Sequence, residues 1–186
     1  MGLLGWLTKR KNSNRGKVDD WHRRWRNVCQ TPSLEAVAEL GDALDVLNLP
    51  EDEIEVEWEM LGGLRHLVAR QAAAASGSLP LVETGHRVVG TDRCHFSAPA
   101  SMPDDANQPS GRLILTHVRA IFAGGGKATT IPWHAVSDVV HQERDVILIR
   151  RDRETMYRFR CNLFGDALEA AWLARTLADG TRRQRV

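Results

Sequence analysis

The sequence predicts an α+β protein, in which a helical N-terminal section precedes a small antiparallel β-domain. Up to about residue 77 the apolar residues recur at helical spacing, and from about residue 81 they alternate, as they do in half-buried strands. Residues 111–122, followed by 124–127 and 131–136, have the pattern strand, tight corner, strand, glycine hairpin and strand. The Gly- and Ser-containing stretch 77–80 is the predicted boundary between the two sections.

Three helices are predicted in the first section. The first is capped by Asp19 or Asp20 and runs to about Gln30, after a flexible polar linker at 12–17, and Trp21, Trp25 and Val28 form its apolar stripe. Thr31 is the predicted N-cap of the second helix, and Pro50 opens the third. The predicted buried stripes are Leu34, Val37, Leu40, Leu44 and Leu47 in the second helix, and Ile54, Trp58, Leu61, Leu64 and Val68 in the third.

Seven short strands and a closing helix are predicted in the second section. The strands are expected at 86–98, 111–116, 118–123, 128–132, 136–142, 145–151 and 155–161, with a polar loop at 99–109. The helix is expected to begin at Asn162 or Gly165. Its predicted apolar sector consists of Leu163, Phe164, Ala167, Leu168, Ala171, Trp172 and Leu177.

The β-section resembles bacterial PH-like and GRAM-like domains over about residues 81–178. Those domains carry a weak pattern of glycine, alternating hydrophobic residues, Thr-x-x-Arg and a hydrophobic run that ends in phenylalanine. The matching residues here are Gly111, Leu113, Leu115, Thr116, Arg119, Ala120, Ile121 and Phe122, followed by Ile131, Pro132 and Val136. Ala120 is small for its place, and His117 stands where asparagine is common. The resemblance implies a seven-stranded antiparallel PH-like β-barrel, capped by the C-terminal helix, in a protein that binds rather than catalyses.

Charge is segregated along the chain although the net charge is only +1. Residues 1–30 hold eight Lys/Arg and two Asp, whereas residues 31–80 hold two Arg and ten Asp/Glu. The predicted parts are therefore a basic and apolar arm (1–17), a helical section (18–77), a PH-like domain (81–178) and a basic tail (179–186). Three widely spaced cysteines argue against a disulfide framework and favour a reducing compartment. With neither a secretory signal nor a long apolar run, the expected location is the cytoplasm.

No motif predicts catalysis, a cofactor or a metal. The Gly-Gly-Gly-Lys run at 124–127 lacks the first glycine and the final Ser or Thr of a phosphate loop, so it indicates a hairpin turn. The seven histidines are scattered, and no Cys-x-x-Cys occurs. Cys161 and Cys29 have the spacing of buried residues rather than of nucleophiles. We therefore expect a non-catalytic protein that binds no cofactor.

The N-terminal arm is the first candidate binding element. An apolar turn bearing tryptophan next to basic residues is typical of weak membrane-surface segments. The membrane-contact candidates are Leu3, Leu4, Trp6, Leu7, Lys9, Arg10 and Lys11. Two interpretations stay open: the arm is an anchor at the inner membrane face, or its apolar residues pack back on the fold.

Four arginines are the second candidate. Arg158 and Arg160 point to the outer side of the last strand, and a hairpin would bring Arg150 or Arg151 near them; these four form a candidate patch for an anion or a protein partner. The alternative is a solvated face whose arginines pair with Asp145, Asp152 and Glu154. The loop at 99–109 holds no Lys or Arg, which argues against phosphoinositide recognition in the manner of the family.

The sequence therefore favours a cytoplasmic interaction module, peripheral at the inner membrane face through its arm. A protein partner is expected but not identified. One alternative is an adaptor that binds a protein through the helical section. Another is a small-ligand carrier, which requires a cavity among Phe96, Ile114, Phe122, Val136 and Trp172. Nucleic-acid binding by residues 21–26 is disfavoured, because helical spacing separates the tryptophans from most of the arginines.

Overall fold

The computed structural model describes residues 3–152 and 155–183, with side chains from Arg15 onward. The chain forms two compact units, Met1–Gln71 and Ala72–Val186. The predicted bounds of the arm, the helical section, the PH-like domain and the tail stay a prediction. Within the described residues, no helix combines the length and the hydrophobicity needed to span a bilayer.

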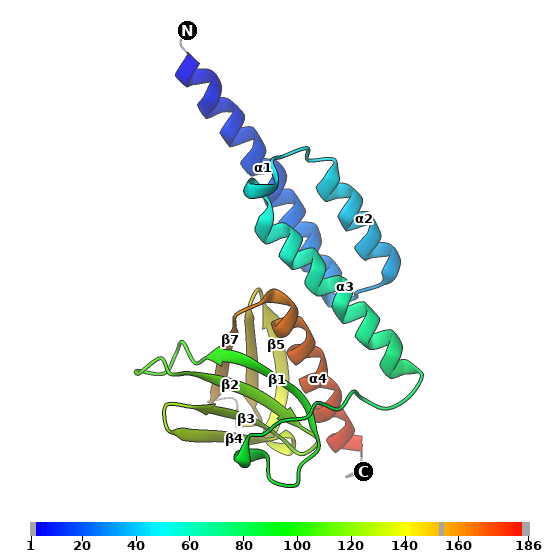
Figure 1. The fold of residues 1–186 in the computed structure, drawn as a ribbon, viewed down its shortest axis with the longest axis vertical. Helices are drawn as coiled ribbons and strands as arrows, with labels where there is room; N and C mark the ends of the chain where they lie inside the picture. The colour runs from blue at the N-terminus through cyan, green and yellow to red at the C-terminus, as the bar shows by residue number, and fades with distance from the viewer. Residues whose placement is uncertain (1–2, 153–154, 184–186) are drawn as a thin grey trace. The chain divides into compact units, whose positions relative to one another are not determined.

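In its described residues, the first unit contains α1 (Leu3–Gln30), α2 (Leu34–Asp45) and most of α3 (Glu55–Ala75), with the 3₁₀ turn η1 (Glu51–Glu53) before α3. In Figure 1, α2 runs antiparallel to both α1 and α3. The connections are short, as expected for neighbouring helices of a bundle.

Two tryptophans of α1 hold the bundle together. Trp21 and Trp25 lie one helical turn apart and are almost completely buried. Nε1 of Trp21 donates a hydrogen bond to Leu40 O of α2 at 3.0 Å, and Nε1 of Trp25 donates to Met60 O of α3 at 3.2 Å. Because each buried indole N–H has an acceptor, the two large rings fill the bundle without leaving a polar group unsatisfied. The predicted burial of these two residues is confirmed.

The linker predicted at 12–17 is wrong, because α1 runs without a break from Leu3 to Gln30. Asparagine, serine and glycine each lower helix stability by at most about 1 kcal/mol relative to alanine. Such residues weaken a helix without ending it. The helix therefore also begins well before the predicted caps Asp19 and Asp20.

The N-cap of α2 is Ser33 rather than the predicted Thr31. The Ser33 hydroxyl accepts a hydrogen bond from Ala36 N at 3.1 Å. Leu34, predicted to be buried, directly follows the cap and is 75 % exposed. The other residues of the predicted apolar stripes of α2 and α3 are all at least partly buried. Val37, Leu40, Leu44, Ile54, Leu61, Leu64 and Val68 are buried, and Leu47 and Trp58 are half-buried.

Seven strands form one antiparallel sheet in the order β4-β3-β2-β1-β7-β6-β5. Their bounds are β1 Cys94–Ser101, β2 Ser110–Thr116, β3 Arg119–Gly124, β4 Lys127–Pro132, β5 Val136–Gln142, β6 Asp145–Arg150 and β7 Met156–Cys161. Six of the seven predicted strands match to within two residues at each end. The predicted first strand does not, because residues Arg87–Val89 form a 3₁₀ turn, η2, and Gly90 follows with a φ of 61°. β1 then continues through Pro99 into the predicted loop.

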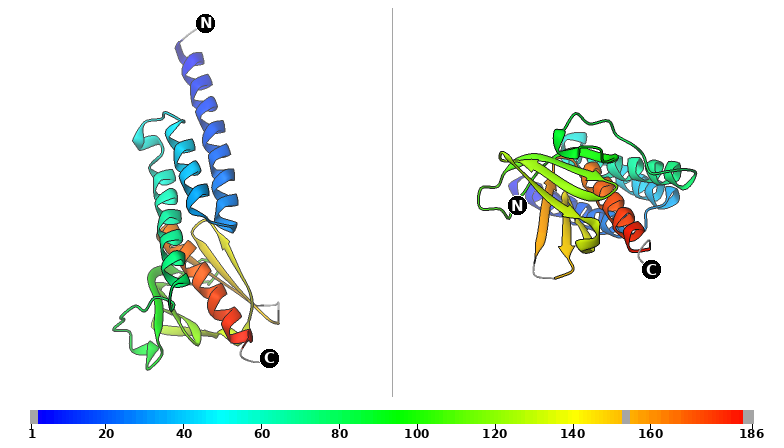
Figure 2. Two further views of the ribbon diagram at one scale, coloured as in Figure 1. Left: turned by 90° about the vertical axis from the view of Figure 1, so that its right-hand side faces the viewer. Right: turned by 90° about the horizontal axis from the view of Figure 1, so that it is seen from below.

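The structure confirms the predicted fold class, a helical section followed by a seven-stranded antiparallel PH-like sheet with a closing helix, and the sheet itself is open rather than a closed barrel. In the described part of the chain, β1 joins β7 through just two residue pairs, Ala100↔Cys161 and Ser101↔Arg160. Pro99 stands directly before these pairs and has no N–H to donate, which limits pairing there. At the other end of the order, the 3₁₀ turn η3 (Trp133–Ala135) leads from β4 to β5 without pairing them. Figure 2 shows the resulting sheet bent over on itself.

Helix α4 (Phe164–Arg183) covers the inner face of this sheet (Figures 1 and 2). Its buried residues pack with the inward side chains of the strands in one core, which includes Phe122, Trp133 and Phe159. Six of the seven residues of the predicted apolar sector are at least partly buried. Leu163 is the exception, because it precedes the helix and is 51 % exposed.

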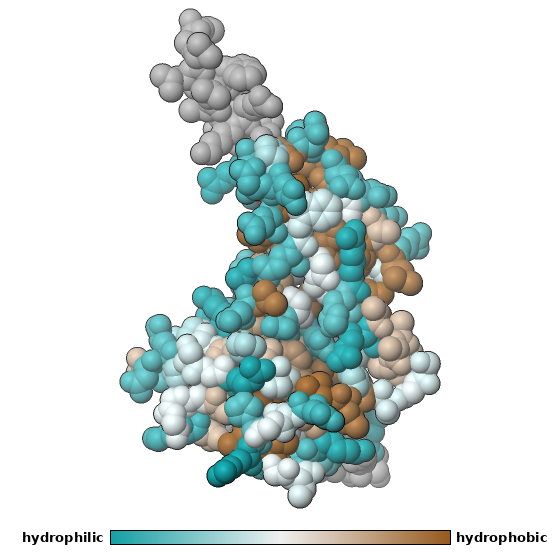
Figure 3. Space-filling model, viewed as in Figure 1, coloured by the Kyte–Doolittle hydropathy of each residue, from teal (hydrophilic) through white to brown (hydrophobic). Residues whose placement is uncertain are grey.

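A second, smaller core lies on the outer face of β1–β3. Ile114 and Ile121 pack there against Cys94 and Val89, with Val82 half-buried beside them. The segment that contributes Val82 and Val89 precedes β1 and is held by a hydrogen bond from Val82 N to Cys94 O at 2.9 Å. We call residues 79–93 the strap. On the face seen in Figure 3, exposed hydrophobic residues form separate patches among hydrophilic ones.

Candidate functional site

Arg158 and Arg160 lie side by side on the outer face of β7, as their alternation with buried Phe159 predicts. Asp145, the first residue of β6, lies opposite Arg160 in the strand register. The Arg160 Nε donates to Asp145 Oδ1 at 2.8 Å, and the Arg158 Nε and Nη2 donate to Oδ2 at 2.8 and 2.5 Å. We call these three residues the arginine cluster.

The two arginines control the ionisation of Asp145. Burial of this carboxyl, whose side chain is 5 % exposed, tends to raise its pKa, but the hydrogen bonds and positive charges of Arg160 and Arg158 outweigh that effect and lower the pKa. The same contact with Asp145 raises the pKa of Arg160. The cluster is therefore ionised at neutral pH, and one negative charge lies beneath two positive ones.

The other two predicted patch arginines lie at the opposite end of β6. Arg150 pairs with Asp152 at 3.3 Å, and Arg151 is exposed. The structure thus brings Arg158 and Arg160 together and leaves Arg150 and Arg151 apart from them. Sequence reasoning missed a further contact, in which Asp104 of the β1–β2 loop lies 3.5 Å from Arg158 Nη1. The sequence feature that could have indicated this contact is the pair Asp104 and Asp105, in a loop that holds no Lys or Arg.

The arginine cluster can hold an incoming carboxylate or phosphate only in competition with its own acids. Arg160 is the more accessible group, with 52 % of its side chain exposed against 32 % for Arg158. A planar guanidinium that is half exposed and oriented by Asp145 can accept a second acidic group from solution. The anion or partner role of the four arginines stays a prediction.

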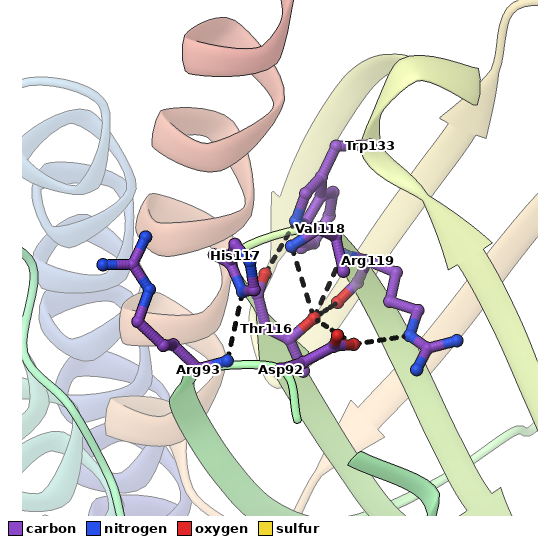
Figure 4. A network of polar contacts seen from close by, with 7 residues as sticks. All are labelled: Asp92, Arg93, Thr116, His117, Val118, Arg119 and Trp133. Carbon is purple, nitrogen blue, oxygen red and sulfur yellow. Dashed lines mark hydrogen bonds and ion pairs between the residues drawn. The ribbon is translucent and has the colours of Figure 1, made fainter. Parts of the chain in front are cut away.

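The Thr-x-x-Arg motif forms a polar network at the β2–β3 corner (Figure 4). Thr116 is completely buried, and its hydroxyl accepts a hydrogen bond from Arg119 N at 3.2 Å and donates to Arg119 O at 3.0 Å. Asp92 of the strap accepts from Arg119 Nε at 2.7 Å. Nε1 of the buried Trp133 donates to Thr116 O at 2.8 Å. We call these residues the corner network.

This network gives the strongest sequence motif a structural role. The Arg119 guanidinium joins the corner to the strap, and the Thr116 carbonyl joins it to the turn after β4. Gly111 has a comparable explanation, because a Cβ there would lie 2.2 Å from Ala123 O on the paired strand. The motif therefore specifies the fold, and the function must be sought elsewhere.

The glycine run at 124–127 is a hairpin turn, as predicted. Gly125 and Gly126 have φ values of 59° and 75°, and Gly124 pairs with Lys127 at the end of the ladder. Two successive positive φ angles define the tight turn that joins neighbouring strands with their native twist. The phosphate-loop interpretation finds no support in this geometry.

The membrane-contact candidates belong to helix α1, and the structure describes the course of their backbone but not their side chains. They are Leu3, Leu4, Trp6, Leu7, Lys9, Arg10 and Lys11. Their contacts, and hence the choice between an anchor and a segment packed on the fold, stay a prediction.

The helical unit holds a shallow groove of about 460 Å³ between α1 and the C-terminal end of α2. Ala43, Val46 and Leu47 supply its accessible apolar surface above the buried Trp21, and Lys17, Asp20, Arg24 and Asp42 supply its charges. Val46 is 81 % exposed. Sequence analysis missed this site because it expected Trp21 and Leu47 to be purely internal and assigned Val46 no role.

The remaining chemical candidates are structural. Burial raises the pKa of both Cys29 and Cys161 to about 12, so neither thiol is ionised at neutral pH. Among the described residues, no group of three or more His, Cys, Asp or Glu could hold a metal ion. The tryptophans at 21 and 25 are buried, so they offer no stacking surface to a nucleic acid.

The residues proposed to line a carrier cavity do not face one space. Phe96, Phe122 and Val136 belong to the packed inner core, with Trp172 against it, whereas Ile114 belongs to the outer core under the strap. The carrier alternative therefore has no site of the kind it requires.

Comparison with known proteins finds no matching family model and no matching curated protein. Solved structures do show similarity. The N-terminal PH domain of human ARAP2 is 12 % identical, with a TM-score of 0.38 over 46 % of this chain and 80 % of that chain. Inner Membrane Complex Sub-compartment Protein 1 from Toxoplasma gondii is 13 % identical, with a TM-score of 0.40 over 45 % and 82 %.

The DH/PH domain of human ARHGEF11, solved with human RhoA and its inhibitor, covers more of the chain. It is 10 % identical, with a TM-score of 0.42 over 88 % of this chain and 54 % of that chain. The PH-like fold stated above rests on this chain's own strand order and closing helix. The bacterial and GRAM-like resemblance stays a prediction.

Proposed function

We propose that this protein is a non-catalytic, cytoplasmic interaction module held at the inner membrane face by the N-terminal segment of α1. The observation that carries the proposal is the continuity of α1 from Leu3 to Gln30, where a flexible linker was expected. A helical segment continuous with a packed bundle transmits a surface contact directly to that bundle, whereas a flexible arm would not.

The contacts within the helical unit place this segment beyond its neighbours. His22 Nε2 lies 2.6 Å from Glu57 Oε1, close to the start of α3, and Lys17 lines the groove with Val46 and Leu47, past the end of α2. The part of α1 before these positions therefore extends past both helices, as Figures 1 and 2 show. Residues 3–14 span about 18 Å at 1.5 Å per residue.

The composition of the segment suits an anionic membrane surface. The spacing of the sequence predicts Leu3, Leu4 and Leu7 on one side of a helix with Trp6 at its margin, and the basic run 9–11 follows. Arg15 and Lys17 are exposed and continue the positive charge toward the bundle. Each basic residue near an anionic surface contributes about 1 kcal/mol, so the expected binding is weak, reversible and sensitive to salt.

Co-sedimentation with liposomes tests the proposal. The full chain should bind vesicles that contain anionic lipid, bind neutral vesicles less, and lose binding at high salt. A chain lacking residues 1–14 should not bind. Two point variants separate the contributions: Leu3→Ser with Trp6→Ser removes apolar contact at constant charge, and Lys9→Gln with Lys11→Gln removes charge. Arg87→Gln with Lys127→Gln is the control, because it removes two positive charges from exposed positions of the β-domain instead. Binding that survives loss of residues 1–14 would contradict the proposal.

The groove between α1 and α2 favours a second candidate function, an adaptor whose helical unit accepts a protein partner. Its large exposed side chain, Val46, stands beside the rings and methyl groups of Trp21 and Ala43. Val46→Asp should abolish such association, whereas Leu34→Asp, at the opposite end of α2 and outside the groove, should leave it intact.

A further inference from the structure

We infer that the α1–α2 groove is occupied by a second copy of this chain, with the two α1 helices parallel and their N-termini on the same side. We identify the occupant from the opposite charges of the two groove walls and from the antiparallel directions of the helices, α1 and α2, that form them. The inference deepens the adaptor function and, in its last consequence, rests on the proposed membrane contact.

The groove has the make-up of an unfinished helix–helix contact. Its floor is formed by Trp21 and Ala43, and its open side exposes Val46. Ala43 is small, so a helix from another molecule can approach the bundle closely at this point. Two helices form one side of a four-helix bundle, and two more with the same apolar surface complete it.

The walls carry opposite charge. The α1 wall contributes Lys17 and Arg24, with a single acid, Asp20, that pairs with Arg23 at 2.8 Å. The α2 wall contributes Asp42. The other charged residues of α2, outside the groove lining, are also acidic and exposed, at Glu35, Glu39 and Asp45. A two-fold axis along the groove places the basic wall of each copy against the acidic wall of the other, so each favourable contact occurs twice.

The positions of these residues along the helix axes agree with this pairing. α1 and α2 are antiparallel and joined by the Trp21–Leu40 hydrogen bond, so Lys17 lies at the level of Val46 and Arg24 near that of Glu39. A two-fold axis along the groove preserves these levels. Measured along the helix axis alone, Lys17 and Arg24 are each then offset by about one helical turn, or about 5 Å, from the level of Asp42 in the second copy. α1 of one copy also becomes antiparallel to α2 of the other, as in four-helix bundles.

The parallel arrangement has a consequence at a membrane. Both N-terminal segments extend from the same end of the dimer, so both reach the same surface. A single weak anchor gives marginal binding, and two linked anchors bind much more strongly because the second contact is intramolecular. Dimer formation would thus set the strength of the membrane contact.

Sedimentation velocity on the full chain without lipid tests the dimer. From low micromolar to several hundred micromolar protein, the mass should rise from monomer to dimer. Val46→Asp should weaken association by about tenfold or more, since it places a charge in the apolar contact. Leu34→Asp, which changes an equally exposed side chain of α2 outside the groove, should leave association unchanged. Lys17→Glu and Asp42→Lys should each weaken it several-fold, and their combination should restore it.

A cysteine at Gly16 tests the direction of the helices, because a Cβ at that position meets no atom within 4 Å. In the parallel dimer the two Gly16→Cys residues lie at the same level, so a bismaleimide should link them, with the wild-type chain as the control for the native cysteines. A monomer at every concentration, equal loss with Leu34→Asp, or no cross-link in a dimer would overturn the inference. Because these measurements contain no lipid, failure of the membrane proposal appears separately, as failure to bind liposomes.

Discussion

The two halves of the open sheet differ in what covers their outer faces. On β1–β3, Ile114 and Ile121 lie beneath the strap and are 0 % and 1 % exposed. On β5–β7, the corresponding side chains remain accessible: Val140 is 36 % exposed and Met156 is 66 % exposed. One half of the sheet is therefore covered on both faces, whereas the other has one face available for contact.

The polar groups follow the same division. In the corner network, Thr116, Asp92 and Arg119 bond to one another and to Trp133, within the covered half. In the arginine cluster, Asp145 is buried, but Arg160 keeps half of its surface in solvent. The two clusters have similar chemistry but different roles. The corner network fixes the chain in one conformation, whereas the arginine cluster presents an oriented charge on an uncovered face.

The difference between the two halves of the sheet predicts that substitutions in the corner network cause the largest loss of stability. Thr116→Val keeps the shape of the side chain but leaves Arg119 N and Arg119 O without their partner in a buried site. Each unsatisfied group costs about 1–3 kcal/mol, so the free energy of unfolding should fall by about 3 kcal/mol. Denaturant unfolding measures it. Thr130→Val, on exposed edge strand β4, is the control and should change stability by less than about 0.5 kcal/mol. Equal effects at the two positions would remove the distinction between the halves.

A smaller, pH-dependent effect is expected from the arginine cluster. The pKa of Asp145 is lowered in the folded state, so its contribution to stability is present above the ordinary carboxyl pKa of about 3.9 and is lost as the pH falls through the folded pKa. Asp145→Asn should cost about 2 kcal/mol at pH 7, less than a fully buried pair because the arginines are partly exposed. The difference from wild type should shrink below about pH 4.

Urea unfolding between pH 2 and pH 7 would show this trend. Asp104→Asn is the matched control, because Asp104 meets Arg158 at 3.5 Å but is 66 % exposed, and its effect should be within about 0.5 kcal/mol at all pH values. A loss from Asp145→Asn that stays constant down to pH 2 would mean that the carboxyl acts through its shape rather than its charge.

Most of the fold could be predicted because periodicity reports local burial. The strands around the 124–127 hairpin and the stripe of Trp21 and Trp25 depend on neighbours a few residues away, and the structure has them as expected. The errors occurred where distant groups decide. Closure of the sheet depends on whether its edge strands β4 and β5 pair, and the course of the chain before β1 depends on packing against Ile114 and Ile121. A single sequence carries no local signal for either.

The candidate sites divide in the same way. Alternation in β7 predicts that Arg158 and Arg160 share a face, and opposite charge suggests Asp145 as their partner, which the structure has. The contact with Asp104 and the groove at Val46 depend on a loop and on a helix end that pack against other elements. Leu34 and Val46 illustrate the limit: both are apolar residues of the α2 region and both are exposed, but only the packing of α1 places one of them beside a groove.

The smallest effect is expected on the uncovered face itself. Met156→Ser removes a side chain that is 66 % exposed on β7, so the free energy of unfolding should change by no more than about 0.5 kcal/mol. Val89→Thr in the strap keeps nearly the same side-chain volume but places a hydroxyl in a site that is 4 % exposed, and it should cost about 1–2 kcal/mol. Thermal and urea unfolding of the two variants give the comparison. If Met156→Ser destabilised the protein as much as Val89→Thr, the outer face of β5–β7 would be covered in solution, and a contact with a second molecule would have to be part of the folded state.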